Sequence, residues 1–355
     1  MSLGKGYMSI GALIKGVTWG TAVECGALSG FEFLRENIQE RVALLPDEEV
    51  RANAFRRAGD KGSEAYTGSV DMNFRYRGLD LWLALAFGEC STSQVSGTVY
   101  KHVLKPANTR EGQFATLVLQ KTVDLEEYTS IKVTGFHLKV SQGGKAEVTF
   151  DLVAHGLNRN TDTGTNDATT FASVTVPTTR DVALFSQMTA WINAYDGADF
   201  DDDVDTVYIN AFALDVTQPF VEDDYSTWGG TKIEEPTADG KFDVKLKFDW
   251  RKYSDAAGGN SALVAAAQTK GKYKAKVQLT GAYNITGAYY HDLTMYFPEL
   301  QIPEQDHSIP GANVIPTSIS FDAVEAESAP TGFSTGYTEP IIAELQNELT
   351  TSPIA

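Results

Sequence analysis

The chain has 355 residues, of which 42% are hydrophobic, and its formal net charge is −18. This length and composition allow two domains or one large β domain with a sizeable core. The negative charge argues against a protein that binds nucleic acid through its own charge, because phosphate contacts need lysine and arginine.

The same charge suits a surface that nucleic acid passes without sticking, although from charge alone plain solubility is the better interpretation. The two cysteines, Cys25 and Cys90, do not make a disulfide framework, and no Cys-x-x-Cys motif occurs. There is no apolar run of about 18 residues, so no membrane span is expected. The N-terminus also lacks the pattern of a secretion signal, which predicts synthesis in the cytoplasm.

The first part of the chain predicts an arm, an undecided segment and a loop. Residues Met1 to Gly30 are rich in glycine and small side chains, and they predict an extended arm that contains Trp19. The next segment, Phe31 to Arg51, is compatible with either a helix or a strand. Residues Arg51 to Gly62 then predict a basic exposed loop.

A unit of strand, break and helix occurs in each half of the chain. In the first half, Val70 to Tyr76 alternate as a strand, and Leu79 to Phe87 have the apolar spacing of a short helix that ends at Gly88. In the second half, the strand Val244 to Trp250 precedes a helix at Asn260 to Gln268, with Asn260 or Ser261 as its N-cap. We expect further strands at Phe114 to Thr122 and at Tyr273 to Leu279.

Two hairpins dominate the hydrophobic pattern. Residues Ile131 to Val153 alternate around a Gly-Gly turn, with one slip that a bulge at Gly135 would restore. A similar run at Val207 to Val216, with its partner at Val244 to Phe248, carries a slip at Asn210-Ala211. The shared slip favours an internal repeat, although any two antiparallel hairpins look alike.

The remaining segments are a boundary loop, a few strands and a C-terminal extension. Residues Asn158 to Asp167 predict the loop, and Phe171 to Val176 look like a strand. The last strands are expected at Leu293 to Phe297 and Ile319 to Ala323. After a linker, an apolar stripe at helical spacing predicts a helix too short to fold alone, which docks on its own body or on a neighbouring copy. The stripe consists of Ile341, Ile342, Leu345 and Leu349.

The domain organisation follows from these segments. We predict an N-terminal arm at 1–30, a first β module at 31–160, a connector at 161–205, a second β module at 206–325 and a C-terminal extension at 326–355.

The sequence contains no recognisable catalytic, cofactor or metal motif. Phosphate-binding loops, nucleophile elbows and His-Glu-x-x-His are absent, and no pair of carboxylates stands out as a glycosidase pair. The run Asp199 to Asp205 resembles a calcium loop but lacks its glycine and its bidentate glutamate, so a solvated acidic loop is the better interpretation. Five histidines lack metal-ligand spacing and read as structural: His102, His137, His155, His291 and His307.

Taken in order, these elements resemble the tail tube (major tail) proteins of long-tailed bacterial viruses. The resemblance begins with the arm Val17 to Ala22 and with the basic loop Arg56 to Gly62, which leads into the strand Gly68 to Phe74. It continues with the helix closed by Gly88 and with the hairpin Tyr128 to Leu152. The second half repeats the pattern at Phe212 to Val216 and Gly240 to Phe248. The second-half insertion and the extension after Pro298 depart from the family pattern.

The resemblance implies a mainly β protein, a tail-tube-type β-sandwich or barrel with flanking short helices and a duplicated module. Such a protein is structural, not an enzyme. Its subunits join edge to edge into rings, and stacked rings form a tube that holds a tape-measure protein and later conducts DNA. The implied partners are further copies of the chain, the tail terminator and the distal tail proteins. The protein would belong to the virion tail and be made in the bacterial host cytoplasm.

Two questions remain open at this stage. The family's usual ring has six copies of one module, so a chain with two modules would form a three-chain ring with pseudo-sixfold symmetry, whereas a single module would give six chains. The assembly arms are predicted to carry Trp19 at one end and Ile341, Ile342, Leu345 and Leu349 at the other. The alternatives to a tube are a capsid decoration protein, a tail-tip adaptor and a carbohydrate-binding β-sandwich.

Overall fold

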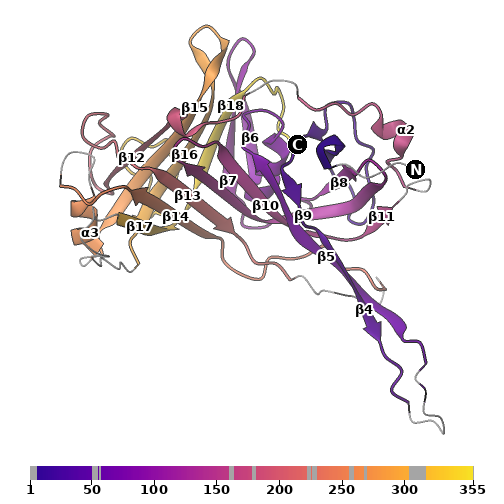
Figure 1. The fold of residues 1–355 in the computed structure, drawn as a ribbon. Helices are drawn as coiled ribbons and strands as arrows, with labels where there is room; N and C mark the ends of the chain where they lie inside the picture. The colour runs from indigo at the N-terminus through magenta and orange to yellow at the C-terminus, as the bar shows by residue number, and fades with distance from the viewer. Residues whose placement is uncertain are drawn as a thin grey trace.

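The computed structural model describes residues 6–49, 55, 57–159, 164–177, 181–221, 225, 230–255, 260–267, 270–303 and 317–354. Strands dominate these residues and the helices are short, so the prediction of a mainly β protein is confirmed (Figure 1). No helix within these ranges is both long and apolar enough to span a membrane.

The first half of the chain contains most of the strands. They are β1 (Ile10–Lys15), β2 (Gly30–Phe31), β3 (Arg35–Glu36), β4 (Gln39–Leu45), β5 (Asp60–Asn73), β6 (Gly88–Ser96), β7 (Val99–Pro106), β8 (Ala115–Gln120), β9 (Leu125–Ser141), β10 (Ala146–Ala154) and β11 (Leu157–Arg159). The second half adds β12 (Met188–Ala194), β13 (Ala211–Thr217), β14 (Asp243–Trp250), β15 (Lys272–Thr286), β16 (Tyr289–Gln301), β17 (Thr317–Val324) and β18 (Ile342–Asn347). The helices are η1 (Gly6–Met8), α1 (Asp80–Phe87), α2 (Ala168–Phe171), η2 (Phe185–Gln187) and α3 (Ser261–Ala267).

Six antiparallel strands form what we call the central sheet, in the order β5-β10-β9-β13-β14-β17. A second group, β12-β15-β16-β18-β7-β6, joins it where β17 pairs with Glu299–Gln301 of β16. At the other side the N-terminal part of β9 pairs with β8, which pairs with β1. One hydrophobic core contains residues of all these strands, as expected for sheets that fold over a shared interior.

The predicted hairpin with its bulge is confirmed. Strands β9 and β10 pair with Gly135 opposite Asp151 and Val133 opposite Leu152, so Thr134 is the extra residue. The bulge keeps apolar side chains on one face on both sides of the slip, and Val133 and Phe136 are both buried.

The second hairpin differs from its prediction. Strands β13 and β14 pair without a break, and β13 begins at Ala211, so Val207 and Ile209 lie before the strand. The backbone of the segment before β13 bonds to a different strand, because the N–H of Val207 donates to the carbonyl of Ala190 in β12. The slip predicted at Asn210-Ala211 is therefore wrong, because it marks the start of the strand.

The two predicted helices are confirmed as α1 and α3. Helix α1 ends at Gly88, which has a left-handed φ of 91° and donates its N–H to the carbonyl of Ala84. Inside the core, the ring of Trp82 stacks on Phe150 of β10 at a centroid distance of 5.1 Å. Helix α1 thus fills the space over the central sheet.

One local prediction is wrong, and one segment that the sequence left undecided consists of strands. The strand expected at Phe171 to Val176 does not form, and this segment follows the short helix α2 as a turn and irregular chain. The side chain of Asp167 caps α2 by accepting the N–H groups of Thr169 and Thr170. The undecided segment Phe31 to Arg51 contributes strands β2, β3 and β4.

The C-terminal stripe forms strand β18 and not a helix. Residues Ile342–Asn347 pair with β16 on one side and with β7 on the other. Hydrogen bonds on both edges favour the extended backbone over a helix too short to be stable alone. The predicted last strands are confirmed within β16 and β17.

Candidate assembly surfaces

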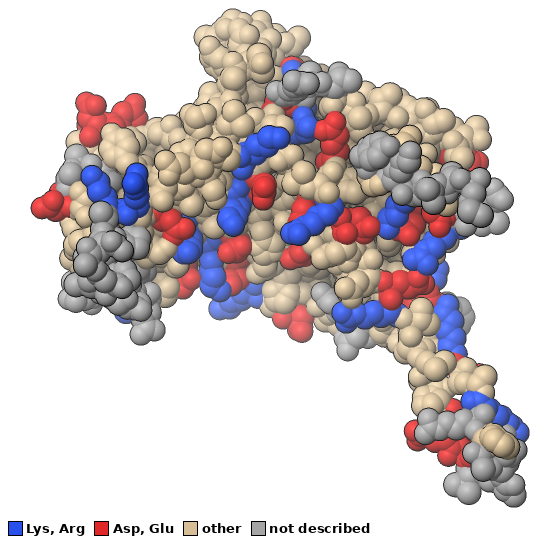
Figure 2. Space-filling model, in the orientation of Figure 1, with Lys and Arg blue, Asp and Glu red and all other residues tan. Residues whose placement is uncertain are grey.

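The central sheet has one buried face and one polar face. Along β10, β13, β14 and β17 the buried and accessible residues alternate, as expected for a sheet packed on one side only. The accessible positions hold more carboxylates than lysines, and Figure 2 shows acidic and basic side chains interspersed on the surface. These positions are Asp71, Glu147, Asp151, Asp215, Asp243, Asp249 and Asp322 against Lys139, Lys245 and Lys247.

A histidine links three strands on this polar face. Nε2 of His137 in β9 lies 2.9 Å from Oδ2 of Asp151 in β10, and Nδ1 lies 2.7 Å from Oδ1 of Asp215 in β13. The hydrogen bond to Asp151, together with that to Asp215, raises the pKa of His137 to about 9. At neutral pH the charged imidazolium therefore bridges two carboxylates across the middle of the sheet.

Strands β4 and β5 extend from the body as a two-stranded arm (Figure 1). All seven residues of β4 are exposed, and they include Val42, Leu44 and Leu45, with Leu44 70% accessible. In the described part of the chain, β4 pairs with β5 alone, so its outer edge is open. An open edge with exposed apolar side chains is a liability in a monomer and a suitable surface for pairing with another copy.

Strand β13 shows what a covered strand looks like in the same sheet. It pairs with β14 on one edge and with residues Gly135–Ser141 of β9 on the other. Its apolar side chains Phe212, Leu214 and Val216 are buried. The contact between β9 and β13 is thus a complete junction between the two halves of the chain.

The segment after β13 packs over the first half through buried cations. The ring of Phe220 lies 5.0 Å from the guanidinium of Arg110 and 5.3 Å from Nζ of Lys132. Oε1 of Glu235 lies 2.7 Å from the same Nζ and accepts the N–H of Gly112 at 2.7 Å. Burial lowers the pKa of Arg110 to about 10 and lowers that of Lys132, since both cations are taken out of water.

The predicted N-terminal assembly residue lies against this same segment. Trp19 is half-buried, its ring packs edge-on against Phe114, and its Nε1–H donates to the carbonyl of Ile233 at 3.1 Å. The residue therefore docks within its own chain. Strand β1, which we placed in the N-terminal arm, is likewise part of the body because it pairs with β8 along its length.

The predicted C-terminal assembly residues also lie in the body. Ile341, Ile342 and Leu345 are buried, and Leu349 is 36% exposed. The expectation that this stripe stays free for a neighbour does not fit the structure, because β18 fills the gap between β16 and β7. The other alternative, docking on the chain's own body, describes these residues.

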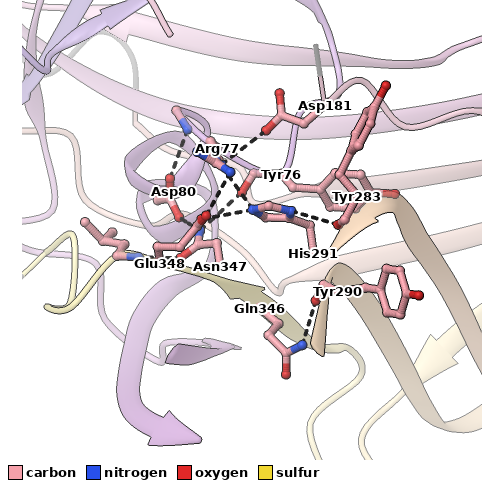
Figure 3. A network of polar contacts seen from close by, with 12 residues as sticks. Tyr76, Arg77, Asp80, Asp181, Tyr283, Tyr290, His291, Gln346, Asn347 and Glu348 are labelled. Atoms are coloured by element: carbon pink, nitrogen blue, oxygen red, sulfur yellow. Dashed lines mark hydrogen bonds and ion pairs between the residues drawn. The ribbon is translucent and has the colours of Figure 1, made fainter. Parts of the chain in front are cut away.

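A polar network fixes the end of β18 (Figure 3). Glu348 accepts from Nη2 of Arg77 at 2.8 Å and lies 2.9 Å from Nε2 of His291. The side chain of Asn347 donates to the carbonyl of Tyr76 at 3.2 Å. The network thus connects β18 to the segment between β5 and α1.

The acidic run Asp199 to Asp205 is a loop with locally satisfied carboxylates. Asp202 accepts the Nε1–H of Trp191, and Asp205 accepts from the side chain of Asn193, both at 2.9 Å. In the described residues no group of three or more histidine, cysteine or acidic side chains could hold a metal. Below the loop, Nζ of the buried Lys274 donates to three carbonyl groups, those of Gly197, Ala198 and Thr331.

Two of the described histidines, His102 and His291, contact neighbouring residues at the end of β18, and the other two lie elsewhere. Nε2 of His102 lies 3.0 Å from Oδ1 of Asn347, Nδ1 of His155 lies 3.2 Å from Oγ1 of Thr129, and His291 belongs to the network in Figure 3. His307 lies outside the described residues. The four described histidines therefore do not form a cluster that could hold a metal within the described residues.

The surfaces most suited to contact with another molecule were missed at the sequence level. The signal for the β4–β5 arm was the alternation of apolar residues next to the basic loop, in a segment that we left undecided between helix and strand. The open edge of β4 depends on which strands pair with each other, and the hydrophobic pattern of the sequence does not show that.

A family model described as "Phage tail tube protein" matches residues 9–323. No curated protein matches the chain.

Proposed function

Because the chain belongs to the phage tail tube protein family, we propose that its copies join into rings and that stacked rings form a conduit for DNA during infection. The observation that carries this proposal is the β4–β5 arm, a strand pair that leaves the body with an open edge and exposed apolar side chains. A structure of this kind gains stability when a neighbouring copy covers it.

The polar face of the central sheet is the surface that we assign to the lumen. Its carboxylates outnumber its lysines, and a net negative wall repels the phosphate backbone, so DNA slides past without being held. The buried face carries the core and so is not accessible to any partner. A conduit needs this combination of a rigid wall and weak affinity for its cargo.

The remaining partners follow from the same function. Before DNA passes, the lumen would hold the tape-measure protein, and the two ends of the tube would contact the tail terminator and the distal tail proteins. The protein would act in the virion tail after synthesis in the host cytoplasm. These assignments rest on family membership and on the assembly surfaces described above.

Electron microscopy of the purified full-length chain tests the proposal. We expect hollow rings or tubes, and native mass spectrometry should show a closed oligomer. Compact monomers at all concentrations, or monomers that bind glycans, would contradict a tube function and favour the carbohydrate-binding alternative.

A further inference from the structure

A small cavity lies where three parts of the chain meet. Its volume is about 160 Å³, and a cavity of roughly this size, about 150 Å³, can hold a benzene molecule. Four of its residues are labelled in Figure 3. The wall consists of Tyr76, which follows β5, of Asp181, Leu184 and Gln187, which precede β12, and of Gly281, Ala282, Tyr283 and His291 in the β15–β16 hairpin.

Two buried polar groups of this wall lack a hydrogen-bond partner. The hydroxyl of Tyr76 and both carboxylate oxygens of Asp181 have none among the described residues. Tyr76 is 1% exposed and Asp181 is 7% exposed. Buried polar groups in folded proteins are nearly always hydrogen-bonded, so such exceptions need a physical cause. The cavity that both side chains line is the place where a shared partner would bind.

The charged groups around Asp181 leave one negative charge in excess. Arg75 makes its close contact with Glu32, and Arg77 makes its close contact with Glu348 at 2.8 Å. Both arginines lie farther from Asp181, at 3.8 Å. Two arginines therefore face three carboxylates. Burial raises the pKa of Asp181, which shows that the arginines do not fully offset the cost of taking its charge out of water.

The hydroxyl of Tyr76 lies in the same negative environment. Its pKa is raised by burial and, beyond that, by the charges of Asp292 and Asp181. The carboxylate of Asp292 is itself bonded to Gln278 and Thr280, both at 2.9 Å. Of these two carboxylates, only that of Asp181 lines the cavity. The cavity thus favours a ligand that brings positive charge and hydrogen-bond donors.

The rest of the wall suits an apolar group next to that charge. Leu184, Ala282 and the ring of Tyr283 line the cavity. Gly281 allows the hairpin to approach Tyr76 closely, because a Cβ at this position would lie 3.3 Å from Cε2 of the tyrosine ring. The faces of tyrosine rings also attract cations.

From these observations we infer that the cavity binds a primary ammonium group on a short alkyl chain. Such a group has three N–H donors, which match the two oxygens of Asp181 and the hydroxyl of Tyr76. Its charge pairs with the carboxylate, and hydrogen bonds between charged groups are stronger than neutral ones. The alkyl chain lies against Leu184 and Ala282. A metal ion fits less well, since no three metal-ligating side chains meet in the described part of the chain.

The ligand would connect the first half of the chain to the second. Tyr76 lies between β5 and α1, Asp181 lies between α2 and η2, and Tyr283 lies in β15. A molecule that binds these groups only in the folded chain raises the unfolding temperature. The inference does not rest on the tube function, because every group comes from one copy of the chain.

Calorimetric titration of the full-length chain with ethylammonium chloride tests the site. We set the measurement at about pH 8, where histidine side chains such as His291 are ordinarily neutral. One molecule should bind per chain, and the unfolding temperature should rise more than it does with sodium chloride at the same ionic strength. A linear diamine that binds more tightly would identify the ligand as the end of a longer amine, whereas equal affinity would identify a small free amine.

Two variants locate the binding. Asp181→Asn keeps the shape of the side chain and removes its charge, so the affinity for ethylammonium should fall about tenfold or more. Tyr76→Phe removes only the hydroxyl and should lower the affinity about threefold to tenfold. Because this hydroxyl has no hydrogen bond to lose, Tyr76→Phe should leave the stability of the ligand-free chain unchanged, which keeps the test valid if Asp181→Asn fails to fold.

Matched controls change the same atoms at exposed positions. Asp203→Asn lies in the acidic loop, and Tyr208→Phe lies at a residue that is 72% exposed. Both should bind ethylammonium like the unmodified chain. A chain that does not bind the amine would overturn the inference, and so would a rise in unfolding temperature that sodium chloride reproduces. Folded Asp181→Asn and Tyr76→Phe variants with unchanged affinity would overturn it as well.

Discussion

Nδ1 of His137 lies 2.7 Å from Oδ1 of Asp215, and this contact connects β9 in the first half of the chain to β13 in the second. The same ring reaches Asp151 in β10. One side chain therefore reinforces the junction at the centre of the polar face.

The histidine predicts a pH dependence of stability. Its folded-state pKa, about 9, lies above the ordinary histidine pKa of 6.5, so the protonated form is favoured by folding. The contribution is fully present below pH 6.5 and is lost as the pH rises through 9. Because the side chain is 32% accessible, screening limits the effect to about 1 kcal/mol. Urea unfolding of the unmodified chain and of His137→Gln measures it. Equal losses of stability in the two proteins between pH 6.5 and 9 would show that His137 does not contribute the pH dependence.

The buried face of β13 predicts a large loss of stability on truncation. Phe212 is 1% exposed and packs on Phe248 at a centroid distance of 5.3 Å. Replacing Phe212→Ala should cost roughly 3–5 kcal/mol, from lost transfer energy and the cavity left behind. Denaturant titration measures the cost, with Ala213→Ser on the accessible face as the control. A loss below about 1 kcal/mol would mean that the face is not part of the core.

The C-terminal strand predicts a role in folding. Deleting residues 340–355 removes β18 and exposes the edges of both β16 and β7. We expect the truncated protein to lose secondary structure by circular dichroism and to aggregate in gel filtration. The half-exposed control Leu349→Ala should remain folded. A truncated chain that stays monomeric and folded would show that β18 is dispensable for the core.

The arm predicts a defect of assembly without a defect of folding. Leu44 is 70% accessible, so Leu44→Asp should change the stability of the isolated subunit by less than about 0.5 kcal/mol. If the arm docks on a neighbour, a buried unpaired carboxylate there should abolish tube formation. Val123→Asp, at a 56% accessible position off the arm, is the control. Normal tubes from Leu44→Asp would remove the arm from the contact.

The sequence predicted individual strands and helices better than it predicted which strands pair with each other. The alternation in β9 and β10 placed both strands and the bulge, because that pattern depends only on which face is buried. The spacing of Ile341, Ile342 and Leu345 predicted a helix, yet β18 is a strand between two others. Its buried and accessible residues alternate, but a small alanine and a polar asparagine occupy two of the buried positions, so the sequence shows no clear period of two. Short apolar runs do not separate these cases.

The repeat shows the same limit on a larger scale. Similar alternation suggested that β13–β14 repeats β9–β10, but in the structure these hairpins lie side by side, with β13 paired to β9. The hydrophobic pattern of a strand shows which of its faces is buried and does not show which distant strand it pairs with. The open edge of β4 could not be predicted from the sequence for the same reason.

Cryo-electron microscopy of the assembled full-length chain tests the central claim most directly. We predict stacked hollow rings in which the polar face of the central sheet, with His137 and Asp215, lines the lumen, and in which three chains give a pseudo-sixfold wall. Six equivalent chains per ring would contradict the three-chain wall and leave the tube function intact. Particles without a lumen, or a lumen lined by another face, would contradict the assignment of this chain as a DNA conduit.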